Sequence, residues 1–113
     1  MPLIDLSAEE RRVVFECLSA AATGPFFPDW EFHTLFGIER RDVKAVVDAW
    51  PAVDETSENV VLAINNSMNN LLGYPHGRDR EWRQYISVSP EEVARIFGKW
   101  RGEQISGYFE GLR

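Results

Sequence analysis

Apolar residues recur at helical spacing along most of this chain. The clearest case is a pair of stripes with i, i+3, i+4, i+7 spacing, which is the pattern of one face of an amphipathic helix. The stripes are formed by Val43, Val46, Val47 and Trp50 and by Val93, Ile96, Phe97 and Trp100. Pro51 prevents the first of these helices from continuing. The stripes therefore predict helices over about 39–50 and 90–100.

Start and stop signals place the other helices. Residues 7–10 read Ser-Ala-Glu-Glu, a capping box, and Gly24 with Pro25 ends the helix that follows. Residues 89–92 read Ser-Pro-Glu-Glu, with serine as the N-cap and proline in the first helical position. We expect short helices over 30–36 and 79–85, capped by Asp29 and Asp79, and a long helix from about 58 to 72. Residues 86–88 are expected to form a linker or a very short strand, and Ile105 to Leu112 a last amphipathic turn or two.

The two stripes are related by a constant offset of 50 in sequence number, and this offset holds upstream without a gap. Identities at the offset are Ser7/Ser57, Pro25/Pro75, Asp29/Asp79, Glu31/Glu81, Val43/Val93 and Trp50/Trp100. Any two amphipathic helices match to some degree, which is the alternative explanation. We interpret the pattern as a three-helix unit used twice, in halves 7–50 and 57–100 that share one core, followed by a tail over 103–113.

Length and composition indicate a single all-α domain over residues 1–113. Hydrophobic residues are 44% and charged residues 27% of the 113-residue chain, which argues against intrinsic disorder. No apolar run approaches the ~20 residues that a membrane span needs. The first residues lack the pattern of a signal peptide, and the single cysteine, Cys17, has no internal disulfide partner. We therefore expect a cytoplasmic protein without a membrane partner.

The charge balance bears on the partner. With 12 Lys and Arg against 18 Asp and Glu, the net charge is −6, which disfavours nucleic acid and favours a basic protein. The charge is uneven, because residues 48–58 contain Asp48, Asp54, Glu55 and Glu58 and no Lys or Arg. We expect Asp54, Glu55 and Glu58 to take part in partner binding.

Four asparagines, Asn65, Asn66, Asn69 and Asn70, lie in the predicted helix over 58–72. Asparagine is a poor helix former, so together they cost roughly 2–3 kcal/mol relative to alanine, and some other role should offset that cost. One reading is structural, with the amides satisfying backbone groups of loops. The other reading is a polar recognition surface that includes Asn66, Asn69 and Asn70.

The segment from Phe26 to His33 is dense in aromatic residues. Phe26, Phe27 and Trp30, beside Asp29, either fill the gap between the halves or form an exposed protein-binding hot spot. Asp29 and His33 stand at i, i+4, but the sequence offers no further histidine or cysteine on the same helix to complete a metal site. We expect no metal and no cofactor.

Loop 74–80 is the counterpart of loop 24–30 at the offset of 50. His76 in this loop is a candidate partner-binding residue, and a histidine beside Arg and Asp also has the chemistry of a general base. An alternative function is therefore a small enzyme or ligand-binding protein with a site between the halves. That site would use Asp29, His33, Asn65, His76 and Asp79. A third hypothesis, nucleic-acid binding, would use the local basic cluster of Arg78, Arg80 and Arg83 beside Trp82.

Two stretches, residues 27–37 and 69–75, resemble those of small bacterial proteins that have no assigned chemistry. In size, acidity and lack of a catalytic motif the chain is similar to immunity proteins that neutralise polymorphic toxins. That resemblance implies a cytoplasmic protein-interaction module that inhibits a toxin or another basic partner, and it assigns no functional residue. Homodimerisation is left open by the sequence.

Overall fold

The computed structural model describes residues 3–102. These residues form six α-helices and two short 3₁₀ helices that are joined by loops. In chain order they are η1 (Leu3–Asp5), α1 (Ala8–Thr23), α2 (Asp29–Phe36), α3 (Arg40–Ala49), α4 (Glu58–Gly73), η2 (Asp79–Glu81), α5 (Trp82–Tyr85) and α6 (Pro90–Arg101). The predicted all-α class is confirmed for these residues, which contain no strand, so 86–88 is a linker. The predicted turns over Ile105 to Leu112 lie outside the described residues.

The helix start signals read from the sequence are largely correct. The Ser7 hydroxyl accepts a hydrogen bond from the Glu10 amide at 3.0 Å, and the Glu10 carboxylate accepts one from the Ser7 amide at 2.8 Å, so the capping box is present. Ser89 caps α6 in the same way, by accepting from the Glu92 amide at 3.2 Å.

The expectation that Asp29 and Asp79 act as N-caps is wrong. Each is the first residue of its helix, and the residue before it takes the cap position without a side-chain bond. The Asp29 carboxylate instead forms an ion pair with the Arg40 guanidinium at 3.0 Å. An ion pair with a neighbouring helix has therefore replaced the local cap.

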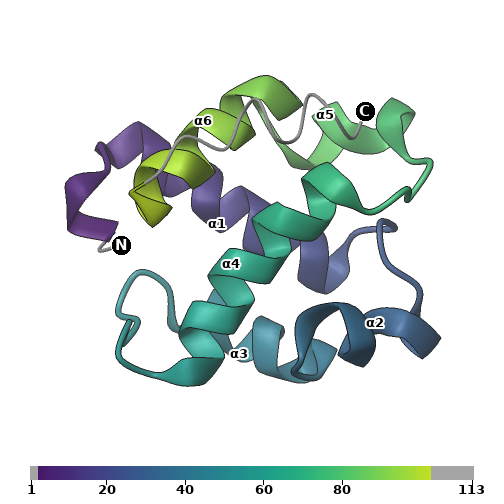
Figure 1. Cartoon of the computed structure of the whole chain (residues 1–113), viewed down its shortest axis with the longest axis horizontal. Helices are drawn as coiled ribbons and strands as arrows, with labels where there is room; N and C mark the ends of the chain where they lie inside the picture. The colour runs from purple at the N-terminus through teal and green to yellow at the C-terminus, as the bar shows by residue number, and fades with distance from the viewer. Residues whose placement is uncertain (1–2, 103–113) are drawn as a thin grey trace.

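Helices α1 and α4 cross in the middle of the molecule, with α2 and α3 below them and α5 and α6 above in Figure 1. The core is built mainly from their inner faces and from the two stripes. Fully buried side chains include Val14, Leu18, Ile64, Met68, Val43, Val93, Phe97 and Trp100. None of the helices in residues 3–102 combines the length and apolar character that crossing a membrane requires.

The elements of the two halves follow the offset that relates the stripes. Both ends of α4 correspond to the ends of α1 at this offset, the start of η2 corresponds to that of α2, and the start of α6 corresponds to that of α3. The packing corresponds as well, because α1 packs on α3 as α4 packs on α6, and each long helix also contacts the short helix of the other half. Asn66 donates to the Phe36 carbonyl at the end of α2 at 2.8 Å, and its counterpart Glu16 accepts from the Ser87 amide after α5 at 2.9 Å.

Arg40, at the start of α3, joins the first three α-helices. Its guanidinium donates to the carbonyl of Ala21 at 2.9 Å, to that of Phe27 at 2.6 Å and to the Asp29 carboxylate at 3.0 Å. It also lies over the Phe32 ring, 4.4 Å from the ring centroid. The planar fork of an arginine can make all these contacts at once, which the single ammonium of lysine cannot. Arg40 therefore closes the space between the C-terminal end of α1 and the start of α2.

Candidate functional site

Trp30 projects from the outer face of α2. It is 82% exposed, whereas Phe32 and Phe36 point into the core with their rings stacked at 4.1 Å. Phe26 and Phe27 are also buried, so of the three aromatic residues expected in a partner site only Trp30 lies at the surface. The neighbouring Asp29 side chain is 93% exposed even though it pairs with Arg40. An exposed indole beside a carboxylate is suited to contact another protein.

The chain segment that carries Trp30 is the most acidic part of the chain. Residues 29–60 contain eight Asp and Glu against three Lys and Arg, whereas residues 61–102 contain four against six. This acidic segment comprises α2, α3, the loop to α4 and the start of α4, which form the lower side of the molecule in Figure 1. A shallow groove of about 240 Å³ between α3 and the loop has alanines along it and Asp42 and Asp54 among its lining.

The three acidic residues predicted around 54–58 differ in availability. Glu58 is exposed at the start of α4, and Asp54 is exposed and accepts bonds from the Thr56 hydroxyl and amide, which lower its pKa. The Glu55 carboxylate instead accepts from the Leu3 amide at 3.0 Å and from the Trp100 indole at 3.3 Å. Glu55 therefore ties the N-terminal segment and α6 to the loop, and Asp54 and Glu58 present the outward charge.

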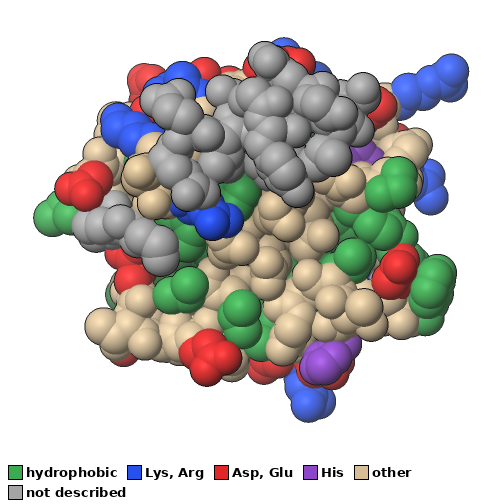
Figure 2. Space-filling model, in the orientation of Figure 1, with side chains coloured by type: hydrophobic (Ala, Val, Ile, Leu, Met, Phe, Trp, Pro, Cys, Tyr) green, Lys and Arg blue, Asp and Glu red, His purple; other side chains and the backbone are tan. Residues whose placement is uncertain are grey.

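The asparagines of α4 are partly used inside the molecule. Asn66 and Asn70 donate to the carbonyls of Phe36 and Leu35, at 2.8 and 3.0 Å, and so satisfy the C-terminal end of α2. Asn65 accepts from Arg101 at 3.2 Å. Asn69 is half-buried, and no bond to its side chain is seen within residues 3–102. In Figure 2 the surface over α4 is mostly tan, the colour of backbone and uncharged polar groups.

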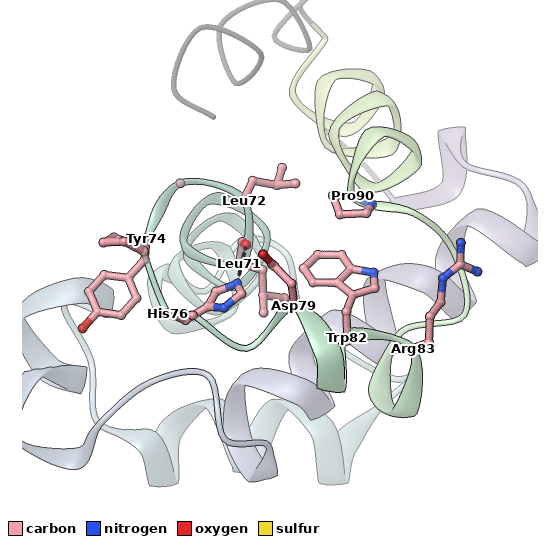
Figure 3. A pocket seen from close by; sticks show the side chains of 11 residues that line it. Leu71, Leu72, Tyr74, His76, Asp79, Trp82, Arg83 and Pro90 are labelled. Carbon is pink, nitrogen blue, oxygen red and sulfur yellow. Dashed lines mark hydrogen bonds between the residues drawn. The ribbon is translucent and has the colours of Figure 1, made fainter.

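A cavity of about 500 Å³ opens between the C-terminal end of α4, the loop that follows it, and the start of α6 (Figure 3). We call it the Trp82 cavity. Its lining includes Leu72, Tyr74, His76, Asp79, Trp82 and Pro90. The His76 ring stands edge-on to Phe26, with centroids 5.0 Å apart, and lies nearly parallel to the Trp82 ring.

The hydrogen bonds of His76 select one tautomer of its neutral ring. Its Nδ1 accepts from the Arg78 amide at 2.9 Å, which places the ring proton on Nε2, and Nε2 lies 3.2 Å from the Leu71 carbonyl to which it donates. Both nitrogens of the neutral ring are therefore engaged. No lone pair is left to act as a general base in this arrangement.

The polar groups around the Trp82 cavity differ in whether they already have hydrogen-bond partners. The Tyr74 hydroxyl donates to Glu31, which raises the pKa of the tyrosine, and the Trp82 indole donates to the Val88 carbonyl at 2.7 Å. The Arg83 guanidinium donates to the Ser87 carbonyl at 3.1 Å. The Asp79 carboxylate, by contrast, receives no hydrogen bond or ion pair from residues 3–102.

The five residues of the expected inter-half site do not come together. His76 and Asp79 line the Trp82 cavity, but Asp29 pairs with Arg40 and His33 lies 3.9 Å from Glu39 on the outer side of α2. The basic trio also divides. Arg78 pairs with Glu81 at 3.6 Å, Arg83 bonds the backbone, and Arg80 is exposed.

The cavity itself was not predicted, although Trp82, His76 and Asp79 were each noted. The offset of 50 contains a signal for it. Pro90 is the counterpart of Arg40 at this offset, so a short ring stands where the first half has a long cationic side chain. The orientation of Trp30 was also readable, since it lies two residues before Phe32 and therefore on the opposite side of the helix.

Other reactive groups offer little chemistry. Cys17 is fully buried in α1, and desolvation raises the pKa of its thiol, so the thiolate is not available as a nucleophile at neutral pH. Within residues 3–102 no three His, Cys, Asp or Glu side chains gather as a metal ion would need. Comparisons of the chain with protein-family models, with curated proteins and with solved structures find no match.

Proposed function

We propose that this protein is an interaction module that binds a basic protein partner through its acidic segment, with Trp30 as the anchor. The observation that carries the proposal is the position of Trp30, which is 82% exposed on the most acidic part of the chain. Large aromatic side chains supply much of the binding energy at protein interfaces, and an indole left in water gains the full benefit of burial when a partner covers it.

The charge of the acidic segment indicates the class of partner. Asp29, Asp42, Asp54 and Glu58 belong to the same segment, and a surplus of carboxylates attracts a cationic surface and speeds the encounter with it. The groove along α3, which is lined mainly by apolar side chains and also by Asp42 and Asp54, suits a partner side chain that has an apolar stem and a basic end. The proposal therefore predicts a partner rich in Lys and Arg.

The biological role that fits this binding mode is inhibition of a toxin. The resemblance in size, acidity and motif content to immunity proteins supports it, and the engagement of both His76 nitrogens and the burial of Cys17 argue against catalysis by these two residues. The proposal places the protein in the cytoplasm, where a lone thiol remains reduced.

The test is an affinity pull-down from the native host with the full chain carrying a tag. We expect a stoichiometric basic protein whose capture weakens steeply with added salt. Trp30→Ala should reduce that capture by about tenfold or more. Ile4→Ala is the matched control, because Ile4 is 81% exposed but lies in η1, outside the acidic segment.

Two outcomes would count against the proposal. One is the absence of any stoichiometric partner. The other is a partner that Trp30→Ala retains as well as Ile4→Ala does, since that partner would be bound elsewhere on the molecule.

The proposal also includes an internal duplication. The shared element spacing and the corresponding packing of α1 on α3 and α4 on α6 support an origin of both halves from one three-helix unit. An experimental structure in which 7–50 cannot be superposed on 57–100 would reject this origin.

A further inference from the structure

The Trp82 cavity lies where the first half of the molecule holds Arg40. In the first half the guanidinium of Arg40 contacts Ala21, Ala22, Phe27, Asp29 and Phe32. Their counterparts at the offset of 50 are Leu71, Leu72, Gly77, Asp79 and Trp82, and all five line the cavity. The counterpart of Arg40 itself is Pro90, which also lines the cavity but has no side-chain donor.

The first of these two places is a complete guanidinium site. Carbonyls from the last turn of α1 and the loop after it accept the N–H groups, a carboxylate balances the charge, and an aromatic ring covers one face. Each of these contacts favours a planar cation with several donors.

The second place presents the same types of group, and no guanidinium of residues 3–102 occupies it. The Asp79 carboxylate has no partner among the described residues, and the Trp82 ring stands beside it at the edge of the cavity (Figure 3). Within residues 3–102, no side chain donates to the carbonyls of Leu72 or Gly77, and only the Leu71 carbonyl is taken, by His76 at 3.2 Å. The C-terminal end of the 16-residue helix α4 adds a negative dipole end.

Arg83 does not fill this space from within. In Figure 3 its side chain extends on the side of Trp82 away from His76, and its guanidinium bonds the Ser87 carbonyl. With about 500 Å³, the cavity is larger than a guanidinium group and leaves room for the chain attached to it.

We propose that the Trp82 cavity binds a guanidinium group supplied from outside the chain, either by an arginine side chain of another protein or by a small guanidinium compound. The Asp79 carboxylate balances its charge, the Trp82 ring covers one face, and the Leu72 and Gly77 carbonyls accept its N–H groups. Trp30 is not part of this site, and the two proposals are tested on different residues, so either can fail without the other.

The experiment is an NMR titration of the ¹⁵N-labelled full chain, following the Trp82 indole N–H and the Asp79 amide. We expect saturable shifts with N-methylguanidinium and with blocked arginine, at least about tenfold weaker binding of blocked lysine, and no saturation with blocked citrulline, which has a similar shape and no charge. A short arginine peptide that binds at least tenfold more tightly than N-methylguanidinium identifies a protein segment as the source. Equal affinities identify a small compound.

Two variants test the assignment of the groups. Asp79→Asn should weaken binding of blocked arginine about tenfold or more, whereas Asp29→Asn, the matched change at the occupied site, should leave that binding intact. Pro90→Arg places a guanidinium at the first position of α6, as Arg40 is placed at the first position of α3, and should abolish binding while the circular dichroism spectrum stays native.

The proposal is overturned by any of three results: no saturable shift at Trp82, an equal response to blocked citrulline, or unchanged binding in Asp79→Asn. A folded Pro90→Arg variant that binds blocked arginine as tightly as the wild type would overturn it too. The introduced arginine would then not compete for the proposed site.

Discussion

Glu10 is the most buried charged residue of residues 3–102, with 8% of its surface exposed. Lys99 donates to its carboxylate at 2.9 Å and Arg95 at 3.0 Å, and the same carboxylate closes the capping box with the Ser7 amide. The bond from Lys99 is the largest cause, followed by that from the Ser7 amide, of a pKa lowered to about 2 from 4.5. One side chain thus starts α1 and fixes α6 against it.

Glu10→Gln should lower the free energy of unfolding at pH 7 by about 2–3 kcal/mol, the size expected for hydrogen bonds between charged groups. Because the folded pKa lies below the unfolded one, this stabilisation is fully present above about pH 5 and is lost as the pH falls toward 2. Urea denaturation of both proteins at pH 7 and pH 3 measures the effect, and their difference should be much smaller at pH 3.

The neighbouring Glu9 provides the control, because it is exposed at the first turn of the same helix. Glu9→Gln should change the free energy of unfolding by less than about 0.5 kcal/mol at either pH. Equal losses for the two variants would mean that the general charge of the helix start, and not the contacts to Lys99 and Arg95, determines stability here.

The two long helices begin with serines that correspond at the offset of 50 but behave differently. Ser7 caps α1 with its hydroxyl, whereas Ser57 precedes α4 without a side-chain cap bond. We expect Ser7→Ala to cost about 1 kcal/mol and Ser57→Ala less than about 0.5 kcal/mol. Thermal or urea unfolding of the two variants measures the difference. If Ser57→Ala lowers the free energy of unfolding as much as Ser7→Ala does, Ser57 also caps its helix, contrary to the observed geometry.

The helices were predictable because their signals are local. The Ser7 and Ser89 starts, the stop at Pro51 and the two apolar stripes act within a few residues, so the sequence placed α1, α3 and α6 nearly where they lie. Asp29 shows where this approach fails. Its carboxylate had a local cap available, but a guanidinium 11 residues away competes for it, and the approach of that guanidinium depends on how α3 packs.

The candidate sites were less predictable, for a related reason. Glu55 looked like a free surface acid, yet it reaches the Leu3 amide, 52 residues away, and the Trp100 indole, 45 residues away. Pro90, the counterpart of Arg40 at the offset of 50, lines the Trp82 cavity, and only the folded positions of these two residues show that each lies at the end of a long helix. Trp30 alone could be assigned to the surface from spacing.

The uneven charge of residues 29–102 along the chain also has a place in the fold. The acidic segment covers α2 and α3 on one side, and α5 and α6 on the other side carry the small basic surplus of residues 61–102. Under the proposed function, we expect a cationic partner to approach the side that carries the acidic segment and Trp30. The Trp82 cavity lies at the C-terminal end of α4, where Tyr74 of its lining bonds Glu31, the residue after Trp30. Contacts of a single partner with both places are therefore compatible with this arrangement.

The polar contacts that join the two halves suggest that neither half is stable alone. Glu10 bonds Lys99, Glu16 bonds Ser87 and Tyr74 bonds Glu31, and all three pairs cross between the halves. Apolar contacts also join the halves, since α1 and α4 pack directly on each other, and the residues buried between them would meet water in a separated half. A single three-helix half has little core left to offset the loss of chain entropy.

We therefore expect the full chain to unfold in one cooperative transition and the fragments 1–53 and 54–113 to be largely unfolded on their own. Mixing them at equal concentration should restore helical circular dichroism, because each fragment supplies the face that the other lacks. The fragments measured separately at the same concentrations are the control. A lone fragment that melts cooperatively would contradict the shared core. Its half would then fold independently, and α1 and α4 would pack together only after each half had folded.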